Sequence, residues 1–332
     1  MKQAIRDLII GGLAMPPVPS IVQSLKGRRN TIGIFTYHAV IEEPLPFFDW
    51  CFLDAELFRK QVAYLSKHFD IISLSDAADM VQAGEIDGPK AVITFDDGYK
   101  NNHDVALPIL KEYSAPASIY LVSDLLGSDR SVWFTRLIMA LDGTPLKQVS
   151  FQDRSWTITT ADEKANCCAD MQQMLKHLSH AELLEKVGEI EDLLQMPRDP
   201  VLSEDSPFRM LDQQTFDNML SSGLIEFGAH TRNHMILSRL SSEVKQEQIA
   251  SSIAGVEQLT GKRCEHFAYP NGSLDDYDNE SIDMLAANNI RSAVTMNPGP
   301  VAASDNMLQL NRYPVGADTT YSRFKLMAHH VA

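Results

Sequence analysis

The strongest constraint on the fold is a regular alternation of short apolar segments with longer amphipathic ones. Between residues 31 and 123 the apolar segments are typical of strands, and the intervening segments repeat their apolar residues at helical spacing. Strands are expected at 31–40, 69–74, 90–95 and 117–123, and helices at 54–68, 75–84 and 101–113. Strands that alternate with helices predict parallel βαβ units and therefore an α/β fold.

The alternation is interrupted between about Leu141 and Phe208, where a mainly helical insertion is expected. This region is polar and irregular, with a strand-like segment at 150–159 and helical stretches at 161–178 and 180–196. We expect it to pack on a barrel or sheet instead of forming a separate domain. The alternation resumes at Asp212, with helices at 212–223, 242–259 and 275–289 and strands at 224–230, 266–270, 291–296 and 308–315.

The chain is expected to consist of an N-terminal helical extension, residues 1–30, and one α/β domain, residues 31–330. Its 332 residues suit one large α/β domain or two modest ones. Within the extension, the apolar stretch Leu8–Met15 is too short to span a bilayer. We expect a short core helix there, with peripheral membrane association through a surface helix as the alternative.

Charge and cysteine content limit the partners and the compartment. The formal net charge is −15, from 44 acidic against 29 basic residues, which disfavours nucleic-acid binding through a broad basic surface. The four cysteines lack the spacing of a zinc site, so free thiols in a reducing compartment are expected. Because no convincing export signal is recognisable, a cytoplasmic location is expected.

Several polar residues directly follow predicted strands. They are His38, Asp96, Asp97, His230 and the run from Tyr269 to Asn271. In parallel α/β folds the ligand site lies at the carboxyl ends of the strands. These residues are therefore expected to meet at one edge of the sheet.

The adjacent carboxylates Asp96 and Asp97 need a compensating charge or proton if they are buried. His230 and His234, four residues apart, can supply two imidazoles, and Asp97 can complete a three-ligand site for a divalent metal. Asp96 would then be free to act as a general base on a metal-bound water. Each residue also has an ordinary structural explanation: a helix cap for the aspartates, and a hydrogen-bonded core residue for a histidine such as His38.

Two motifs together resemble the polysaccharide deacetylase family, the NodB-homology group of carbohydrate esterases. They are "TFDDG" at 94–98 and "HTRNH" at 230–234. "FAYPNG" at 267–272 is similar to the third motif of the family, and "TYHAV" at 36–40 resembles the start of its exopolysaccharide-associated branch. The resemblance extends from Thr31 to about Val315, with the insertion as the least matched region.

The resemblance implies a distorted, incomplete (β/α) barrel and metal-dependent removal of an acetyl group from an N-acetylhexosamine. By match of motif, Asp96 would be the catalytic base, and Asp97, His230 and His234 would hold zinc, with cobalt or nickel as alternatives. Tyr269, Pro270 and Asn271 would contribute to substrate or oxyanion binding, the last through its main-chain N–H.

This sequence departs from the family pattern at three places. Ala268 stands where the family often has the arginine that orients the base, so Arg312 or Arg291 is expected to replace it. Asn271 stands where tyrosine is common. A Leu-x-His motif, the usual general acid, is not recognisable: "MAHHVA" at the C-terminus matches poorly and is expected to fray, and His38 is the candidate acid instead.

The expected function is therefore deacetylation of an N-acetylated sugar in a surface polysaccharide or its precursor. An amide or imide hydrolase of the same fold acting on a non-sugar, or an inactive carbohydrate-binding relative, is the alternative. A nucleotide-sugar glycosyltransferase would not need the two histidines, and no Gly-rich phosphate-binding loop is present. The sequence does not indicate the oligomeric state.

Overall fold

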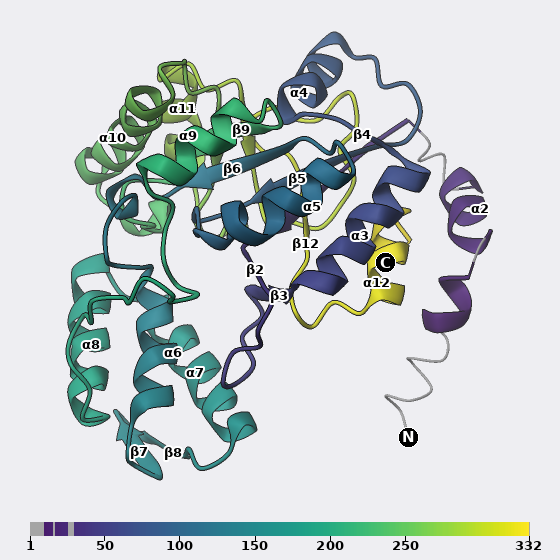
Figure 1. Ribbon diagram of the computed structural model, residues 1–332. Helices are drawn as coiled ribbons and strands as arrows, with labels where there is room; N and C mark the ends of the chain where they lie inside the picture. Colours follow the sequence, from purple (N-terminus) through teal and green to yellow (C-terminus); the bar gives the residue numbers. More distant parts are fainter. Residues whose placement is uncertain (1–9, 16, 26–29, 332) are drawn as a thin grey trace.

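The structure is an open, curled parallel sheet with helices on its outer side (Figure 1). The computed structural model describes residues 10–15, 17–25 and 30–331, with the side chains of 23–25 left undescribed. In this part of the chain one sheet has eight strands, and its main path runs β11-β10-β9-β6-β5-β1-β12, with β4 paired to β5. The strands are β1 (Ile32–Tyr37), β4 (Asp70–Ile71), β5 (Lys90–Phe95), β6 (Ala117–Leu121), β9 (Ile225–Ala229), β10 (His266–Ala268), β11 (Ser292–Val294) and β12 (Tyr313–Pro314).

All strand pairs of this sheet are parallel, which confirms the prediction of βαβ units. β11 and β12 are the two ends of the path, and an isolated bridge from Val294 to Leu310 lies between them. The sheet is therefore an incomplete (β/α) barrel, as expected. Several strands are shorter than the predicted apolar segments, such as β4 within 69–74 and β12 within 308–315.

The helices outside the insertion lie close to their predicted positions, except that the last one occupies a C-terminal segment for which no helix was predicted. They are α3 (Ala55–His68), α4 (Leu74–Ala83), α5 (Leu107–Glu112), α9 (Gln213–Ser221), α10 (Ser242–Thr260), α11 (Asn279–Ala287) and α12 (Tyr321–Ala328). Asp54 caps α3 by accepting a hydrogen bond from the Leu57 N–H at 2.8 Å. The helix predicted at 101–113 is irregular near Pro108, because residues 102–106 before it are wound as a π-helix.

The two sides of each strand face different surroundings. Residues such as Phe35, Ile93 and Phe267 point outward and pack against the helices in the main hydrophobic core. Their neighbours Ile34, Val92 and Ala268 point inward and form a smaller core inside the barrel, with Tyr120. Because side chains alternate along a strand, this division decides which residues can reach the barrel interior.

The insertion is a separate helical layer, drawn in teal at the lower left of Figure 1. It consists of α6 (Trp133–Gly143), the hairpin β7 (Gln148–Phe151) and β8 (Arg154–Thr157), α7 (Ala161–Leu175) and α8 (His180–Leu193). These helices share one hydrophobic core with Phe52 and Tyr99 of the barrel side. Two corrections follow: the layer begins with α6, before the predicted boundary at Leu141, and the segment at 150–159 belongs to an antiparallel hairpin.

Both ends of the chain differ from expectation. The C-terminal segment is not frayed: α12 packs against α3, and His329 is buried and hydrogen-bonded to Tyr64 at 3.0 Å. At the N-terminus, α2 (Val18–Leu25) is described, but Leu8 and Ile9 of the apolar stretch lie outside the described residues. In its described part Leu13 and Met15 are exposed, which contradicts a core helix, although Ala14 is buried. None of the helices in the described ranges is long and apolar enough to cross a membrane.

A buried histidine should make the protein sensitive to acid. His266, the first residue of β10, is hydrogen-bonded to Ser292 Oγ at 2.8 Å and to Ser75 Oγ at 3.0 Å, and burial lowers its pKa to about 4. The unfolded chain binds a proton near pH ~6.5, so the folded state loses up to roughly 3 kcal/mol as the pH falls from ~6.5 towards 4.

We expect His266→Gln to reduce this acid-induced loss of unfolding free energy, measured by urea unfolding at a series of pH values. His177→Gln, a change at an exposed histidine of the insertion, is the control and should leave the pH dependence as in the wild type. An equal pH dependence in wild type and His266→Gln would contradict the prediction.

Candidate active site

A cleft at the carboxyl ends of the strands brings together most of the residues singled out in the sequence. His38 follows β1, Asp96 follows β5, His230 follows β9 and Asn271 lies just beyond β10. The cleft is lined by His38, Trp50, Cys51, Asp96, Phe134, Gln172, Lys176, His230, His234, Asn271 and Met296. The common direction of the strands explains why residues so far apart in the chain meet here.

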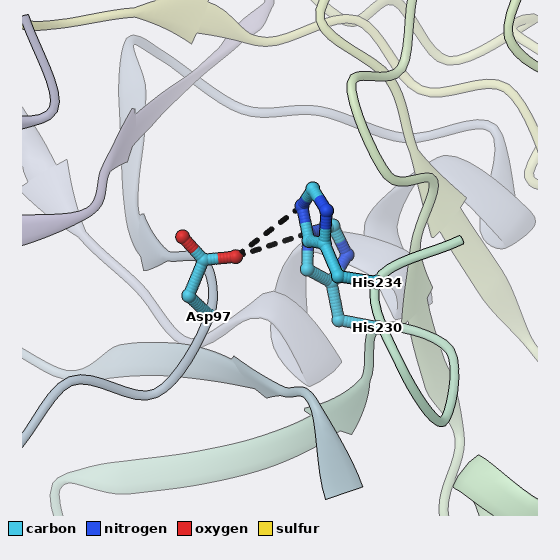
Figure 2. A group of neighbouring side chains, drawn as sticks. All are labelled: Asp97, His230 and His234. Atoms are coloured by element: carbon cyan, nitrogen blue, oxygen red, sulfur yellow. Dashed lines mark ion pairs between the residues drawn. The ribbon is translucent and has the colours of Figure 1, made fainter. Parts of the chain in front are cut away.

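Asp97, His230 and His234 form one buried cluster. Their candidate ligand atoms all lie within 4.8 Å of one another. Asp97 Oδ1 is 3.7 Å from His230 Nε2 and 3.4 Å from His234 Nε2, and Figure 2 shows the carboxylate opposite the two rings. Two donors that are each ~2.1 Å from a tetrahedral ion lie roughly 3.4 Å apart. The three side chains therefore have the spacing of ligands to one small divalent cation.

The unsatisfied polar atoms of the cluster support the same interpretation. Both carboxylate oxygens of Asp97 are buried and have no hydrogen-bond partner in the described part of the chain. Burial and the adjacent Asp96 raise the pKa of Asp97 well above its usual value, against a smaller effect of Arg312. Such a carboxylate is costly as an anion unless a cation is bound next to it. The residues present therefore fit a divalent metal.

His230 is oriented for ligation by the main chain. Its Nδ1 lies 2.7 Å from the carbonyl oxygen of Ala268 and must carry the proton to make this hydrogen bond. The lone pair of Nε2 is then directed towards Asp97 and the centre of the cluster. Burial lowers the pKa of His230, and lowers that of His234 further because His230 is adjacent, so both rings are neutral, as metal ligands must be.

Four residues of the site have a left-handed backbone. The φ angles are 74° for Asp97, 58° for Thr231, 58° for His234 and 59° for Asn271. Such conformations cost on the order of 1–3 kcal/mol each outside glycine, and most for a β-branched residue such as Thr231. The Thr231 Oγ1 accepts the N–H of Met235 at 3.1 Å, which helps to hold this turn. The strain identifies the loops after β5, β9 and β10 as segments shaped by the site.

Asp96 is held by Arg312. Two parallel hydrogen bonds of 2.7 Å join the guanidinium to the two carboxylate oxygens, and both side chains are buried. Burial by itself would raise the pKa of Asp96, but the charge of Arg312, together with its hydrogen bonds and the nearby His230, holds it well below its usual value. Asp96 is therefore a fixed anion. Of the two arginines proposed from the sequence, Arg312 is confirmed, whereas Arg291 pairs with Asp79 and Glu265 elsewhere.

Arg312 is itself anchored from several directions. Its Nε donates to the carbonyl of Thr295 at 2.8 Å, and its Nη1 also donates to Thr36 Oγ1 at 2.9 Å and Thr94 Oγ1 at 3.3 Å. The guanidinium carbon lies 5.6 Å from the centre of the Tyr120 ring. These contacts leave the Asp96 carboxylate a single orientation in the cleft.

His38 lines the cleft as a neutral imidazole. Its ring lies edge-on to Trp50, with ring centres 4.9 Å apart, and its Nδ1 has no hydrogen-bond partner among the described residues. Burial lowers the pKa of His38 to about 4, although the charge of Asp96 acts in the opposite direction. A proton on this ring at neutral pH would therefore need additional negative charge in the cleft.

The third motif contributes one residue to the cleft and two to its support. Asn271 lines the cleft, as predicted. The side chain of Tyr269 instead packs in the outer core, stacks on Tyr277 at 4.1 Å and donates to the Leu308 carbonyl at 2.9 Å. Pro270 is buried, and its carbonyl accepts the Gly272 N–H at 2.7 Å. The prediction of substrate contact is thus wrong for the Tyr269 side chain, and Pro270 shapes the turn.

Several residues that line the cleft were not identified from the sequence. Phe134 lies in α6, Gln172 lies in α7 and Lys176 directly follows α7. Trp50 lies in the segment before β3 (Phe52–Asp54). No motif marks these residues. The available signal was the insertion itself, because a long insertion between strands of an α/β fold tends to lie at the active-site end.

Metal binding should be visible as a change in stability. After treatment with a chelator, added zinc should raise the melting temperature of the wild type, with a stabilisation of about 2.7 kcal/mol at ~100 times the dissociation constant. Asp97→Asn should abolish this rise, because the amide lacks the anionic donor. It should also make the metal-free protein more stable, because an unpaired buried carboxylate is removed.

The matched control is Asp153→Asn, an exposed aspartate in the β7–β8 turn, which should keep the zinc-induced rise. Differential scanning fluorimetry with and without zinc measures both effects. A zinc-induced rise in Asp97→Asn equal to that of the wild type would show that the ion binds elsewhere.

Comparison with known proteins places the fold and the sequence in the same group. IcaB from Ammonifex degensii has a TM-score of 0.59 at 16% identity, with 91% of this chain and 98% of that chain covered. The deacetylase PplD of Streptococcus pyogenes, solved with acetate, has a TM-score of 0.55 at 18% identity, covering 89% and 96%. A de-N-acetylase from Aggregatibacter actinomycetemcomitans has a TM-score of 0.55 at 16% identity, covering 89% and 99%.

At these identities the solved structures show a shared fold alone, and the sequence evidence comes from a family profile. No curated protein matches the chain by sequence. The profile described as "Polysaccharide deacetylase" matches residues 83–293, which is more than half of the chain and includes the Asp96–Asp97 pair and both metal-site histidines. The chain therefore belongs to the polysaccharide deacetylase family.

Proposed function

We propose that this member of the family is a divalent-metal-dependent hydrolase that removes the acetyl group from an N-acetylhexosamine. The main support for the proposal is that two neighbouring carboxylates at one site have different surroundings. Asp97 is part of a buried aspartate–histidine–histidine cluster, and its neighbour Asp96 is a fixed anion outside that cluster. A ligand set next to a separate base is the arrangement that metal-assisted amide hydrolysis requires.

The residues of the site would have different roles in the hydrolysis. A divalent cation held by Asp97, His230 and His234 would act as a Lewis acid and lower the pKa of a bound water towards ~7. Asp96 would accept the proton of the attacking water, and its ion pair with Arg312 would keep the receiving oxygen in place. The main-chain N–H of Asn271 would stabilise the oxyanion. Once negative charge develops beside it, His38 would take up a proton and donate it to the leaving amine, and the proton held by Asp96 would be released to solvent.

Membership of the family supports the proposed substrate class. We propose an N-acetylated sugar within a surface polysaccharide or its precursor, with zinc as the metal and cobalt or nickel as alternatives. The likeness to IcaB and to a de-N-acetylase supports the fold of such an enzyme. A non-sugar amide or imide substrate is the alternative within the same chemistry, and an inactive carbohydrate-binding relative is the alternative outside it.

Acetate release is the direct test. Zinc-loaded wild type should release acetate from N-acetylglucosamine oligomers or from their lipid- or nucleotide-linked precursors. Asp96→Asn should lower kcat by about 10²–10⁴-fold, because it removes the general base and keeps the shape of the side chain. His38→Gln should lower kcat as well, with zinc binding retained.

Chelated protein, zinc-reloaded protein and Asp153→Asn are the controls, and only the first should be inactive. Release of acetate by Asp96→Asn at the wild-type rate would exclude Asp96 as the base, and an unchanged kcat in His38→Gln would leave this ring a structural role. Zinc binding without acetate release from any sugar would favour a non-sugar amide or the inactive relative.

The positioning role of Arg312 predicts a change in pH dependence. Arg312→Lys keeps the positive charge but loses the two parallel hydrogen bonds that lower the pKa of Asp96. The pKa of Asp96 should therefore rise, and the acid limb of the kcat/KM profile should move to higher pH.

A pH–rate profile of wild type and Arg312→Lys measures this shift, and zinc stabilisation of both proteins confirms that each is folded. Arg291→Lys, at an arginine outside the cleft, is the matched control. A lower rate with an unmoved acid limb would indicate that Arg312 supports the fold without tuning the base.

A further inference from the structure

Lys176 is the basic residue that the insertion contributes to the cleft. It directly follows α7, and it lines the cleft together with Asp96, His230 and His234. Its side chain is partly exposed, and the aromatic rings of Trp50 and Phe134 line the same cleft. A lysine that lines the same cleft as Asp96, His230 and His234 can contact a substrate bound there.

The ammonium of Lys176 has no hydrogen bond or ion pair within the described ranges, although acidic groups lie near it. Asp49 is sensitive to its charge, yet the Asp49 carboxylate accepts the Cys51 N–H at 2.9 Å and the Gln172 amide at 3.4 Å instead. Asp96 is already neutralised by Arg312. Lys176 therefore brings a positive charge into the cleft that is not held in an ion pair with any described side chain, although the carboxylate of Asp49 compensates part of it without direct contact.

An occupied metal site would add to the positive charge of the cleft. A divalent cation carries two positive charges and Asp97 offsets one of them, so one net positive charge would remain at the metal. The whole chain, in contrast, has a formal net charge of −15. A locally positive cleft in an acidic protein attracts an anion and steers it to one place.

On the basis of the proposed function, we propose that Lys176 binds an acidic group of the substrate, a carboxylate or a phosphate close to the N-acetyl sugar. The enzyme would then prefer an acidic glycan or a glycosyl phosphate over a neutral N-acetylglucosamine oligomer. The two sources share the same chemistry, an oxyanion that accepts hydrogen bonds from the ammonium.

The test compares acetate release from three substrates by zinc-loaded protein: a glucuronate–N-acetylglucosamine oligomer, N-acetylglucosamine 1-phosphate and a neutral N-acetylglucosamine oligomer. Wild type should favour one acidic substrate in kcat/KM by about ten-fold, as expected for a charged hydrogen bond. The better of the two acidic substrates identifies the source. Lys176→Gln should abolish the preference, and Lys176→Arg should retain part of it.

Lys147→Gln, at an exposed lysine of the same insertion, is the matched control and should keep the preference. Higher salt should weaken the preference of the wild type, because the interaction is electrostatic. Equal kcat/KM for acidic and neutral substrates in the wild type, or a preference retained in Lys176→Gln, would overturn the proposal. An equal fall in kcat on all three substrates would overturn it too, since that result indicates a proton donor.

Binding separates this proposal from the proposed function. If no substrate releases acetate, calorimetry of N-acetylglucosamine 1-phosphate and the glucuronate oligomer with zinc-loaded protein still tests Lys176. Binding that is lost in Lys176→Gln would support the anion site while the hydrolase function fails. Equal binding by both proteins, or none by either, would overturn the anion site.

Discussion

The buried ion pair between Asp96 and Arg312 is the interaction on which the centre of the molecule depends. Asp96 directly follows the inner strand β5, and Arg312 lies beside the edge strand β12, 216 residues later in the chain. The same guanidinium reaches Thr295, just beyond the opposite edge strand β11. One side chain thus bridges the interior of a barrel that hydrogen-bonded strands do not close. Removing one partner of such a pair typically costs about 3–5 kcal/mol, because the other charge is left buried.

The same pair sets the chemistry of the site. A carboxylate with two strong hydrogen bonds from arginine is well oriented but weakly basic. Asp97, one residue away, has the opposite surroundings: it is buried, lacks donors and needs a cation. The difference arises from strand geometry, since Asp96 continues the inward side of β5 and Asp97 turns out of the strand with a φ of 74°. Asp96 and Asp97 thus have different surroundings because the backbone turns between them.

Much of this could be predicted from the sequence, and one error was avoidable. The βαβ alternation identified the sheet, and strand ends followed by polar residues identified His38, Asp96, Asp97, His230 and Asn271. Tyr269 was assigned to the site because it follows a strand, although alternation along β10 puts it on the same side as Phe267, which faces the outer helices. Side chains alternate between the two sides of a strand. Continuing this alternation past the end of each strand would have distinguished the inward-facing residues from the outward-facing ones.

Other features could not be predicted because they depend on contacts between distant segments. Nothing local distinguishes Arg312 from Arg291; the choice depends on which edge of the sheet lies opposite Asp96. Ala268 supplies its carbonyl to His230, and the arginine that holds Asp96 comes instead from the segment just before β12. Lys176 and Phe134 reach the cleft through the tertiary packing of α6 and α7, which helical periodicity alone does not orient.

The separate core of the insertion has a consequence for how such enzymes diversify. Its helices bury their apolar faces against one another and against Phe52 and Tyr99, whereas the residues proposed to hold the metal and the base all come from the barrel. The proposed catalytic residues and the insertion residues of the cleft are thus supported by two different hydrophobic cores. An exchange of the whole layer, from α6 through α8 together with the residues that pack against it, such as Phe52 and Tyr99, could redirect the choice of glycan while the proposed hydrolytic residues stay as they are.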